Sequence, residues 1–162
     1  MKHSWWIDPS KCTGCRTCEV VCSLYHYNEV NSNKSRIRIV KWEDKGLDVP
    51  VVCQHCDRPL CMETCPTGAL YRDGEDSIVS YRKELCIGCK LCLLVCPCGG
   101  IGLHDDGSIL KCDLCGTTPT CVEFCLPKAI EFIPNSQVGE RRKKKAAKAL
   151  IQSCELAEIS DR

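Results

Sequence analysis

The spacing of one run of cysteines constrains this chain more than any other feature of its sequence. Between Lys83 and Ile101, four cysteines follow a C-x2-C-x2-C-x3-C pattern, and a proline comes directly after the fourth of them. Three thiolates on a tight loop hold one cluster of iron and sulfide, and the fourth is placed for a second cluster, as in two-cluster bacterial ferredoxins. A zinc ribbon separates two C-x2-C pairs widely and needs no third cysteine two residues on. The pattern therefore predicts an iron–sulfur site in this segment.

Cysteine quartets of this kind occur four times along the chain. In each quartet three residues separate the third cysteine from the fourth, as expected if one helical turn connects them. The loop before the third cysteine varies in length. The four quartets are Cys12, Cys15, Cys18 and Cys22; Cys53, Cys56, Cys61 and Cys65; Cys86, Cys89, Cys92 and Cys96; and Cys112, Cys115, Cys121 and Cys125. We expect these sixteen cysteines to be iron ligands for four 4Fe–4S clusters.

The high cysteine content also bears on where the protein works. Cysteine accounts for 18 of the 162 residues, far above ordinary usage. In a secreted protein this would indicate a disulfide framework. The opening MKHSWWIDPSKC has no apolar signal-peptide core and no twin arginine, and no apolar run approaches the roughly 18 residues of a membrane span. We therefore expect a cytoplasmic protein with no membrane span and with reduced cysteines that bind metal.

Between the quartets the sequence predicts antiparallel hairpins. Ile37 and Ile39 alternate with polar residues, 44–46 has turn chemistry, and 49–52 is apolar again, which together predict two paired strands. Two further hairpins with Asp or Asp-Gly turns are predicted over 71–81 and 103–112.

The residues after each fourth cysteine predict how the short helices end. Three quartets continue with proline, as CPTGAL, CPCGGI and CLPKAI, and short strands are expected to begin at Leu70, Ile101 and Ile130. Glycines that permit turn conformations precede two of these strands, namely Gly68, Gly99 and Gly100. The first quartet lacks the proline, so its helix, beginning near Cys18, is expected to run past Tyr25.

Residues 135–162 differ from the rest of the chain in charge and pattern. They carry seven Lys or Arg against four Asp or Glu, whereas the whole chain has a formal net charge of +1. No aromatic residue is interleaved for stacking on bases, which argues against nucleic-acid binding. An apolar stripe recurs at helical spacing over Ala147, Leu150, Ile151, Cys154 and Ala157. The pattern favours a helix that docks on a neighbouring subunit over a merely solvated charged face.

The cysteine segments resemble a known family. KCTGCRTCEVVCSLYH, VPVVCQHCDRPLCMETCPTGAL, ELCIGCKLCLLVCPCGGI and KCDLCGTTPTCVEFCLPKAI are similar to segments of four-cluster, ferredoxin-like electron-transfer subunits of molybdenum- and tungsten-pterin oxidoreductases. Dimethyl sulfoxide reductase and formate dehydrogenase have such small subunits. The resemblance covers roughly residues 8–134. The compact chain looks most like the small subunits of tungsten aldehyde oxidoreductases and their benzoyl-CoA reductase relatives.

The resemblance implies a fold and a pairing of the quartets. The fold is α+β, with two pseudo-twofold-related ferredoxin-like units over residues 1–134 and a helical tail over 135–162. The pairing is nested, so that motif 12–22 shares two clusters with 112–125, and motif 53–65 shares two with 86–96. Spacing alone leaves sequential pairing open. The chain departs from the family at Ser23, Leu126 and Cys98, and none of these changes removes a ligand.

The resemblance also implies a function. The chain would be a non-catalytic subunit that passes single electrons through four 4Fe–4S clusters. Its partner would be a large pterin-metal catalytic subunit, with an external acceptor, a flavin subunit or further copies of the complex beyond it. The sequence contains neither a nucleophile–base pair nor a glycine-rich phosphate loop that would indicate an enzyme. Two alternatives remain open: a free-standing polyferredoxin serving a hydrogenase or carbon monoxide dehydrogenase, and a zinc-binding interaction module.

Other residues near the quartets have less specific interpretations. Cys98 is expected to be a small hydrophobe beside a cluster rather than a spare ligand, and Cys154 a free thiol. Packing or hydrogen bonding is expected for His26, His55 and His104, and a lid over the core for Trp5 and Trp6. A positive charge beside a cluster raises its reduction potential. Five basic residues lie beside the quartets and could have this role, but each is equally compatible with a solvated surface position: Lys11, Arg16, Lys90, Lys111 and Lys128.

Overall fold

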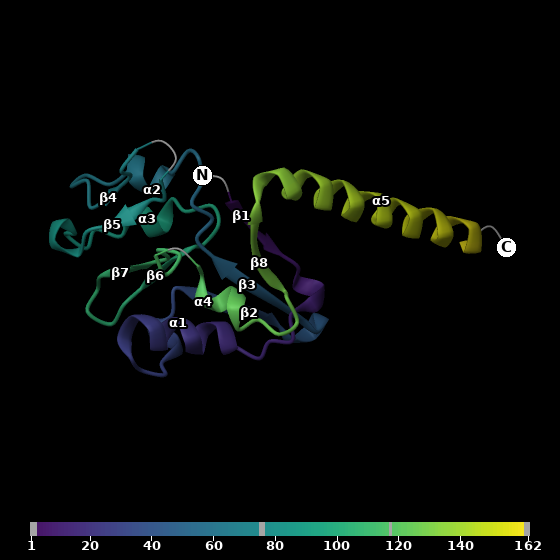
Figure 1. Ribbon diagram of the computed structural model, residues 1–162, viewed down its shortest axis with the longest axis horizontal. Helices are drawn as coiled ribbons and strands as arrows, with labels where there is room; N and C mark the ends of the chain where they lie inside the picture. The colour runs from purple at the N-terminus through teal and green to yellow at the C-terminus, as the bar shows by residue number, and fades with distance from the viewer. Residues whose placement is uncertain (1–2, 75–76, 117, 161–162) are drawn as a thin grey trace.

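A computed structural model of the chain describes residues 3–74, 77–116 and 118–160, and the side chains as far as Gln152 (Figure 1). Helices alternate with two-stranded antiparallel sheets, which confirms the α+β class. The strands pair as β1 (His3–Ile7) with β8 (Ile130–Pro134), β2 (Ile37–Trp42) with β3 (Leu47–Val52), β4 (Leu70–Tyr71) with β5 (Ser80–Tyr81), and β6 (Ile101–Leu103) with β7 (Ile109–Lys111). The helices are α1 (Thr17–Tyr27), α2 (Leu60–Glu63), α3 (Leu91–Leu94), α4 (Thr120–Glu123) and α5 (Asn135–Ser160).

The local predictions for hairpins and strand starts are confirmed. All three predicted hairpins form, and the first turns at Gly46 in the left-handed conformation. Strands begin at Leu70, Ile101 and Ile130, as the residues after the prolines indicate. The helix of the first quartet continues to Tyr27, because no proline ends it.

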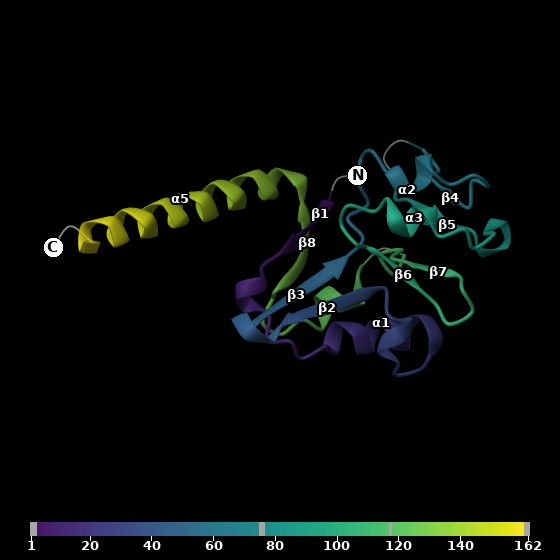
Figure 2. The same cartoon turned by 180° about the vertical axis from the view of Figure 1, so that it is seen from behind.

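The pairing of β1 with β8 joins the two ends of the folded body and was not predicted. Ile7 is the partner of Ile130 in this sheet. Trp5 is buried within the core and its ring centroid lies 5.1 Å from that of Phe132, whereas Trp6 is only half-buried. The two strands lie side by side in both ribbon views (Figures 1 and 2).

Apart from the tail, we divide the chain into two halves, each centred on one hydrophobic cluster, although Cys53 and Ile78 of the inner half pack in the cluster of the outer half. The outer half contains residues 3–52 and 112–134, and the inner half contains residues 53–111. In the outer half α1 packs against α4, and in the inner half α2 packs against α3. The inner half, drawn in teal, lies at one end of the body in Figures 1 and 2. Each half thus brings a helix from one quartet onto a helix from another.

A buried carboxylate joins α1 to the first hairpin in the outer half. Glu19 is only 2% exposed, and its Oε1 accepts a hydrogen bond of 2.7 Å from the backbone N–H of Ile39. Nearby, the hydroxyl of Ser23 donates to the Val20 carbonyl and accepts from the Asn31 N–H. Ser23 therefore holds the end of α1 against the following loop, which accounts for a hydroxyl residue at this position.

The tail forms the single long helix α5, which projects away from the body (Figures 1 and 2). Its first turns are attached to the body: Arg141 pairs with Glu131 at 2.7 Å, and Lys145 lies 3.5 Å from Asp8. The predicted apolar stripe is exposed at Leu150 and Ile151, while its members beyond residue 152, including Cys154, lie outside the described side chains. In the described part of the chain, no helix is both long and apolar enough to cross a membrane.

Candidate metal centres

The four quartets share a local backbone plan that gathers thiols. The third cysteine of each quartet lies in a helix, in α1, α2, α3 or α4, and the fourth follows about one turn later. Non-glycine residues with positive φ are concentrated in and beside the quartet loops: Arg16, His55, Lys90, Leu114, Cys115 and Lys128. Such conformations carry a backbone cost, and they persist at functional sites where the surrounding structure holds them. The quartet loops are therefore tightly bent, which brings their cysteines close together.

The first set of thiols combines the two ends of the folded body. Cys125 of the fourth quartet lines the same small cavity as the first three cysteines of the first quartet. Ile39 and Ile130 line its apolar wall. The thiols in this cavity are Cys12, Cys15, Cys18 and Cys125.

Two further cavities lie in the inner half and have the same composition. One is lined by Cys53, Cys56, Cys61 and Cys96. The other is lined by Cys65, Cys86, Cys89 and Cys92. In each, three cysteines of one quartet meet the last cysteine of the other. Cys98 is half-buried and lines the first of these cavities, so it lies beside a thiol set as predicted.

The thiols of the fourth set lie around Cys121. Burial raises the pKa of Cys121, and the neighbouring thiols of Cys112, Cys22 and Cys115 raise it further. Cys22 of the first quartet therefore lies with the first three cysteines of the fourth. The set consists of Cys112, Cys115, Cys121 and Cys22.

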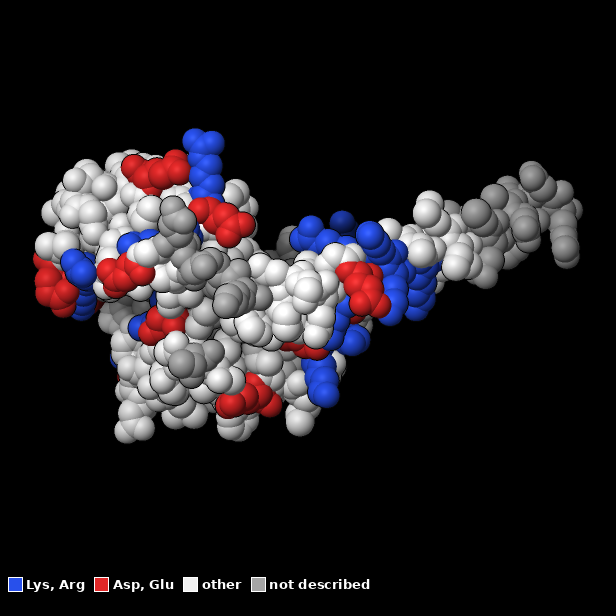
Figure 3. Space-filling view, turned by 45° about the horizontal axis from the view of Figure 1, so that its top comes forward, with Lys and Arg blue, Asp and Glu red and all other residues white. Residues whose placement is uncertain are grey.

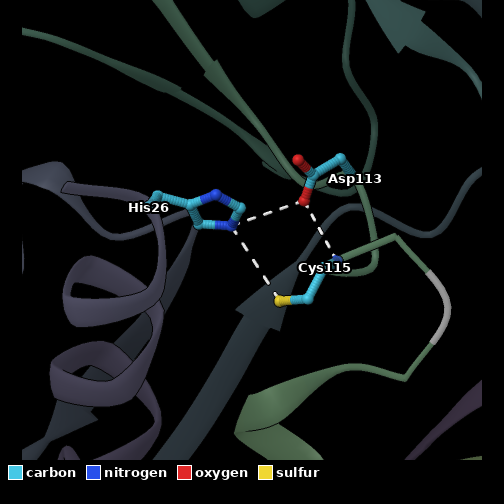
Figure 4. A group of neighbouring side chains, drawn as sticks. All are labelled: His26, Asp113 and Cys115. Carbon is cyan, nitrogen blue, oxygen red and sulfur yellow. Dashed lines mark hydrogen bonds and ion pairs between the residues drawn. The ribbon is translucent and has the colours of Figure 1, made fainter. Parts of the chain in front are cut away.

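A histidine and a carboxylate adjoin this fourth set (Figure 4). The Nε2 atom of His26 lies 3.4 Å from Asp113 Oδ1 and 3.9 Å from Cys115 Sγ. The Cys115 N–H donates to the same Asp113 oxygen at 3.1 Å. Burial lowers the pKa of His26, followed by the effect of the Arg36 charge. His26 thus makes the hydrogen-bonding and packing contacts predicted for it, at the edge of a set that is already complete in thiols.

The other two histidines near the quartets also have packing roles. His55 is buried, and burial followed by the charge of Lys111 lowers its pKa to about 3, so its ring is neutral at physiological pH. His104 stacks on Tyr27 with ring centroids 5.7 Å apart and accepts a hydrogen bond from the Asp106 N–H. These contacts agree with the sequence interpretation.

The five basic residues beside the quartets fall into two groups. Lys111 is only 4% exposed, and its ammonium donates to Cys53 Sγ at 3.1 Å and to the Cys112 carbonyl at 3.4 Å. The remaining four are exposed: Lys11, Arg16, Lys90 and Lys128. The structure therefore separates residues that the sequence alone leaves equivalent.

Backbone donors to sulfur are the functional contacts that sequence reasoning missed. The Gly100 N–H donates to Cys96 Sγ at 3.3 Å, and the Arg36 N–H donates to Cys22 Sγ at the same distance. Gly100 was assigned to a turn, but a Cβ at this position would lie 2.7 Å from Cys53 N and overlap Cys53 Cα. Close approach of two backbones, rather than a turn, therefore requires glycine here.

The residues present fit 4Fe–4S clusters. Each set offers four thiols, and soft thiolate ligands select iron–sulfur clusters or zinc over harder metals. Burial raises the pKa of Cys18 and Cys112 to about 12, so a bound metal must displace their protons. The buried ammonium of Lys111 points at a sulfur, and such a charge needs a negative partner. Thiolate-ligated clusters supply that negative charge.

Comparison with known proteins identifies the class. A family model for the 4Fe–4S dicluster domain matches residues 45–134, and one for the 4Fe–4S binding domain matches residues 5–23. The chain belongs to the 4Fe–4S dicluster family, and 4Fe–4S clusters are its cofactors. This result supports the iron–sulfur prediction over the zinc alternative.

Particular relatives agree with the predicted resemblance. The chain is 33% identical over 169 residues to the probable anaerobic dimethyl sulfoxide reductase chain YnfG of Escherichia coli (91% of this chain, 81% of that protein). It is 43% identical over 121 residues to the polyferredoxin-like subunit of aliphatic sulfonate oxidoreductase from Pyrococcus furiosus (74% and 69%). Among solved structures, it matches the active-site complex BamBC of benzoyl-coenzyme A reductase in complex with benzoyl-CoA (TM-score 0.50, 25% identity, 94% and 96% covered).

Proposed function

We propose that this chain is a non-catalytic electron-transfer subunit of an oxidoreductase complex and holds four 4Fe–4S clusters. The observation that carries the proposal is the gathering of sixteen cysteines into four sets of four thiols. When bound, such clusters supply one-electron redox chemistry. The proposed ligand sets are Cys12, Cys15, Cys18 and Cys125; Cys112, Cys115, Cys121 and Cys22; Cys53, Cys56, Cys61 and Cys96; and Cys86, Cys89, Cys92 and Cys65.

Nested pairing follows from these sets, because each joins a triplet to the last cysteine of another quartet. The outer and inner halves would then be the two pseudo-twofold-related ferredoxin-like units over residues 1–134. Each half contains two helices and two strand pairs, which supports this division. The tail over 135–162 would form a separate docking segment.

The chain's own residues would bind the clusters, exclude water from them and adjust their environment. Ile39 and Ile130 cover the first set, and Leu70 and Ile109 cover the set in the inner half that contains Cys65. N–H donors to cysteine sulfur, such as that of Gly100, stabilise negative charge on the ligands. These are the contributions expected of a protein whose chemistry resides in its cofactors.

Exposed apolar residues beside two of the thiol sets support docking of redox partners. Leu126, next to Cys125, is 93% exposed, and Leu94 on α3 is 76% exposed. Exposed apolar side chains that cluster at a functional site indicate an interaction surface. The names of the relatives describe chains or subunits of reductase and oxidoreductase complexes. On this basis we propose a large pterin-metal catalytic subunit of the aldehyde oxidoreductase type as the partner, and a cytoplasmic location.

The tail is proposed to attach this chain to a neighbouring subunit. In Figure 3 Lys and Arg side chains gather on the part of α5 nearest the body. The basic run covers residues 141–148, and the exposed Leu150 and Ile151 follow it. A helix with a basic segment followed by exposed apolar residues fits a docking role.

Anaerobic purification of the full chain with its natural partners tests the proposal. We expect about sixteen iron and sixteen sulfide per chain, from four irons in each of four clusters, together with copurification of a large subunit. Deleting residues 136–162 should keep the iron and weaken attachment, and deleting only 149–162 separates the apolar segment from the basic one. About eight irons, bound zinc, or a stable free monomer would contradict the proposal. Loss of iron on truncation would show that the tail is part of the folded core and that the proposed domain boundary is wrong.

A further inference from the structure

Lys111 is the one lysine among the described residues that the fold buries. It ends β7 and immediately precedes Cys112, the first cysteine of the fourth quartet. Its side chain turns back to Cys53, the first cysteine of the second quartet, and donates to that sulfur at 3.1 Å. One ammonium therefore contacts the leading residues of two thiol sets, one in each half of the molecule.

This ammonium lacks the usual partner of a buried cation. In residues 3–74, 77–116 and 118–152, no carboxylate forms an ion pair with Lys111. Its polar contacts are the Cys53 sulfur and the Cys112 carbonyl. A buried charge without compensation is strongly unfavourable, so a negative partner is required in the working protein. The partner toward which Nζ points is the sulfur of Cys53.

We propose that Lys111 selectively raises the reduction potential of the cluster held by Cys53, Cys56, Cys61 and Cys96. This inference rests on the proposed function, because it assumes a cluster at that set. Reduction adds one negative charge to a cluster, and a cation in a low-dielectric surrounding favours the more negative form. Hydrogen bonds to the ligand sulfur act in the same direction. Lys111 supplies both effects at one sulfur.

The effect is expected to be strongest at the Cys53 site, because Lys111 donates to a sulfur there and only to a carbonyl at Cys112. Lys11 has the same sequence context, directly before Cys12, yet it is exposed. Water and salt screen an exposed charge strongly. Arg72 is a second cation near the same set as Lys111, but it donates to the carbonyls of Cys56 and Asp57 rather than to a sulfur. Lys11 is therefore the matched control for Lys111.

Redox titration of the anaerobically purified holoprotein, followed by electron paramagnetic resonance, tests the inference. Lys111→Met should move the midpoint of the Cys53 site furthest to lower potential, with a smaller shift at the Cys112 site and little change at the other two. Lys111→Gln keeps a donor without charge and should give a smaller shift, Lys111→Arg should restore most of the original value, and Lys11→Met should change nothing. Repeating the titration in a Cys61→Ser background assigns the shifted signal, since that change alters the signature of the site itself.

Three results would overturn the inference: unchanged midpoints in Lys111→Met, an equal shift of all midpoints, or a shift as large in Lys11→Met. Iron content is measured first for every variant. If Lys111→Met does not keep its iron, Lys111→Gln and Lys111→Arg decide the matter. If neither of these holds the cluster, Lys111 serves assembly and not potential, and the inference is wrong. Failure of the proposed function would appear earlier, as a wild-type protein without four cluster signals.

Discussion

The outer and inner halves of the molecule contain the same kinds of elements but differ in what holds them together. The outer half has an 11-residue α1 and strand pairs of five and six residues. The inner half has four-residue helices and strands of two or three residues. Among the described residues, the hydrophobic cluster centred on the outer half has eleven buried residues, against five in the inner half, and cysteines contribute to both. The outer half therefore has a protein frame of its own, and the inner half depends more on its metal.

The largest expected effect comes from removing the cysteine that crosses between quartets in each half. Cys125→Ala should leave the Cys12 site with three ligands and a three-iron centre, while the fold of the outer half persists. Cys96→Ala should remove the corresponding ligand from the Cys53 site and also unfold β4 to β7, because little else holds those strands. Cluster spectroscopy and amide hydrogen exchange measure the two outcomes.

This pair of variants also tests nested pairing. Cys22→Ala provides the reciprocal control, since it should injure the Cys112 site and spare the Cys12 triplet. If Cys125→Ala and Cys112→Ala perturb the same cluster, the quartets pair differently. Equal loss of exchange protection in both halves would remove the distinction between them.

A smaller effect is expected where the inner half packs against the backbone of Cys53. Gly100→Ala should lower the denaturant midpoint for iron loss, because the new Cβ would overlap Cys53; overpacking of this kind costs about 1–3 kcal/mol. Gly99→Ala is the matched control, since its Cβ would meet only Val51 at 3.7 Å. That variant bears only the left-handed backbone cost of about 1–2 kcal/mol. The signature of the overlap is selective damage to the Cys53 site in Gly100→Ala alone.

The smallest effect concerns the frame of the outer half. Glu19→Ala should destabilise that half by about 1–3 kcal/mol, because it leaves the Ile39 N–H buried without an acceptor. Glu19→Gln keeps an acceptor oxygen and should cost less. Chemical unfolding monitored by Trp5 fluorescence reports on this half. The exposed Glu29→Ala serves as control, and an effect of Glu19→Ala no larger than its own would refute the role of the carboxylate.

Many features of the fold could be predicted from local sequence patterns. The four quartets, the three hairpins and the strands beginning at Leu70, Ile101 and Ile130 all follow from cysteine spacing, turn residues and proline positions. Each of these features is decided within a few residues of chain. The 4Fe–4S cofactor follows from the same spacing.

Contacts between segments far apart in the chain could not be predicted from the sequence. The position four residues after the last cysteine is Ala69 in the second quartet and Ala129 in the fourth, but Gly100 in the third, and only the approach of Cys53 explains the difference. Lys11 and Lys111 likewise share the dipeptide Lys-Cys, and only tertiary packing buries one of them. Such features depend on which distant segment packs against the residue, and no local sequence pattern encodes that packing.

The pairing of β1 with β8 also determines how the chain can emerge from the ribosome. β1 is synthesised well before its partner strand β8. Until Ile130–Pro134 are synthesised, an edge strand bearing Trp5 and Trp6 has nothing to pair with. Unpaired edges with large apolar side chains invite association with other chains. Until β8 has been synthesised, the nascent protein thus depends on shielding of β1.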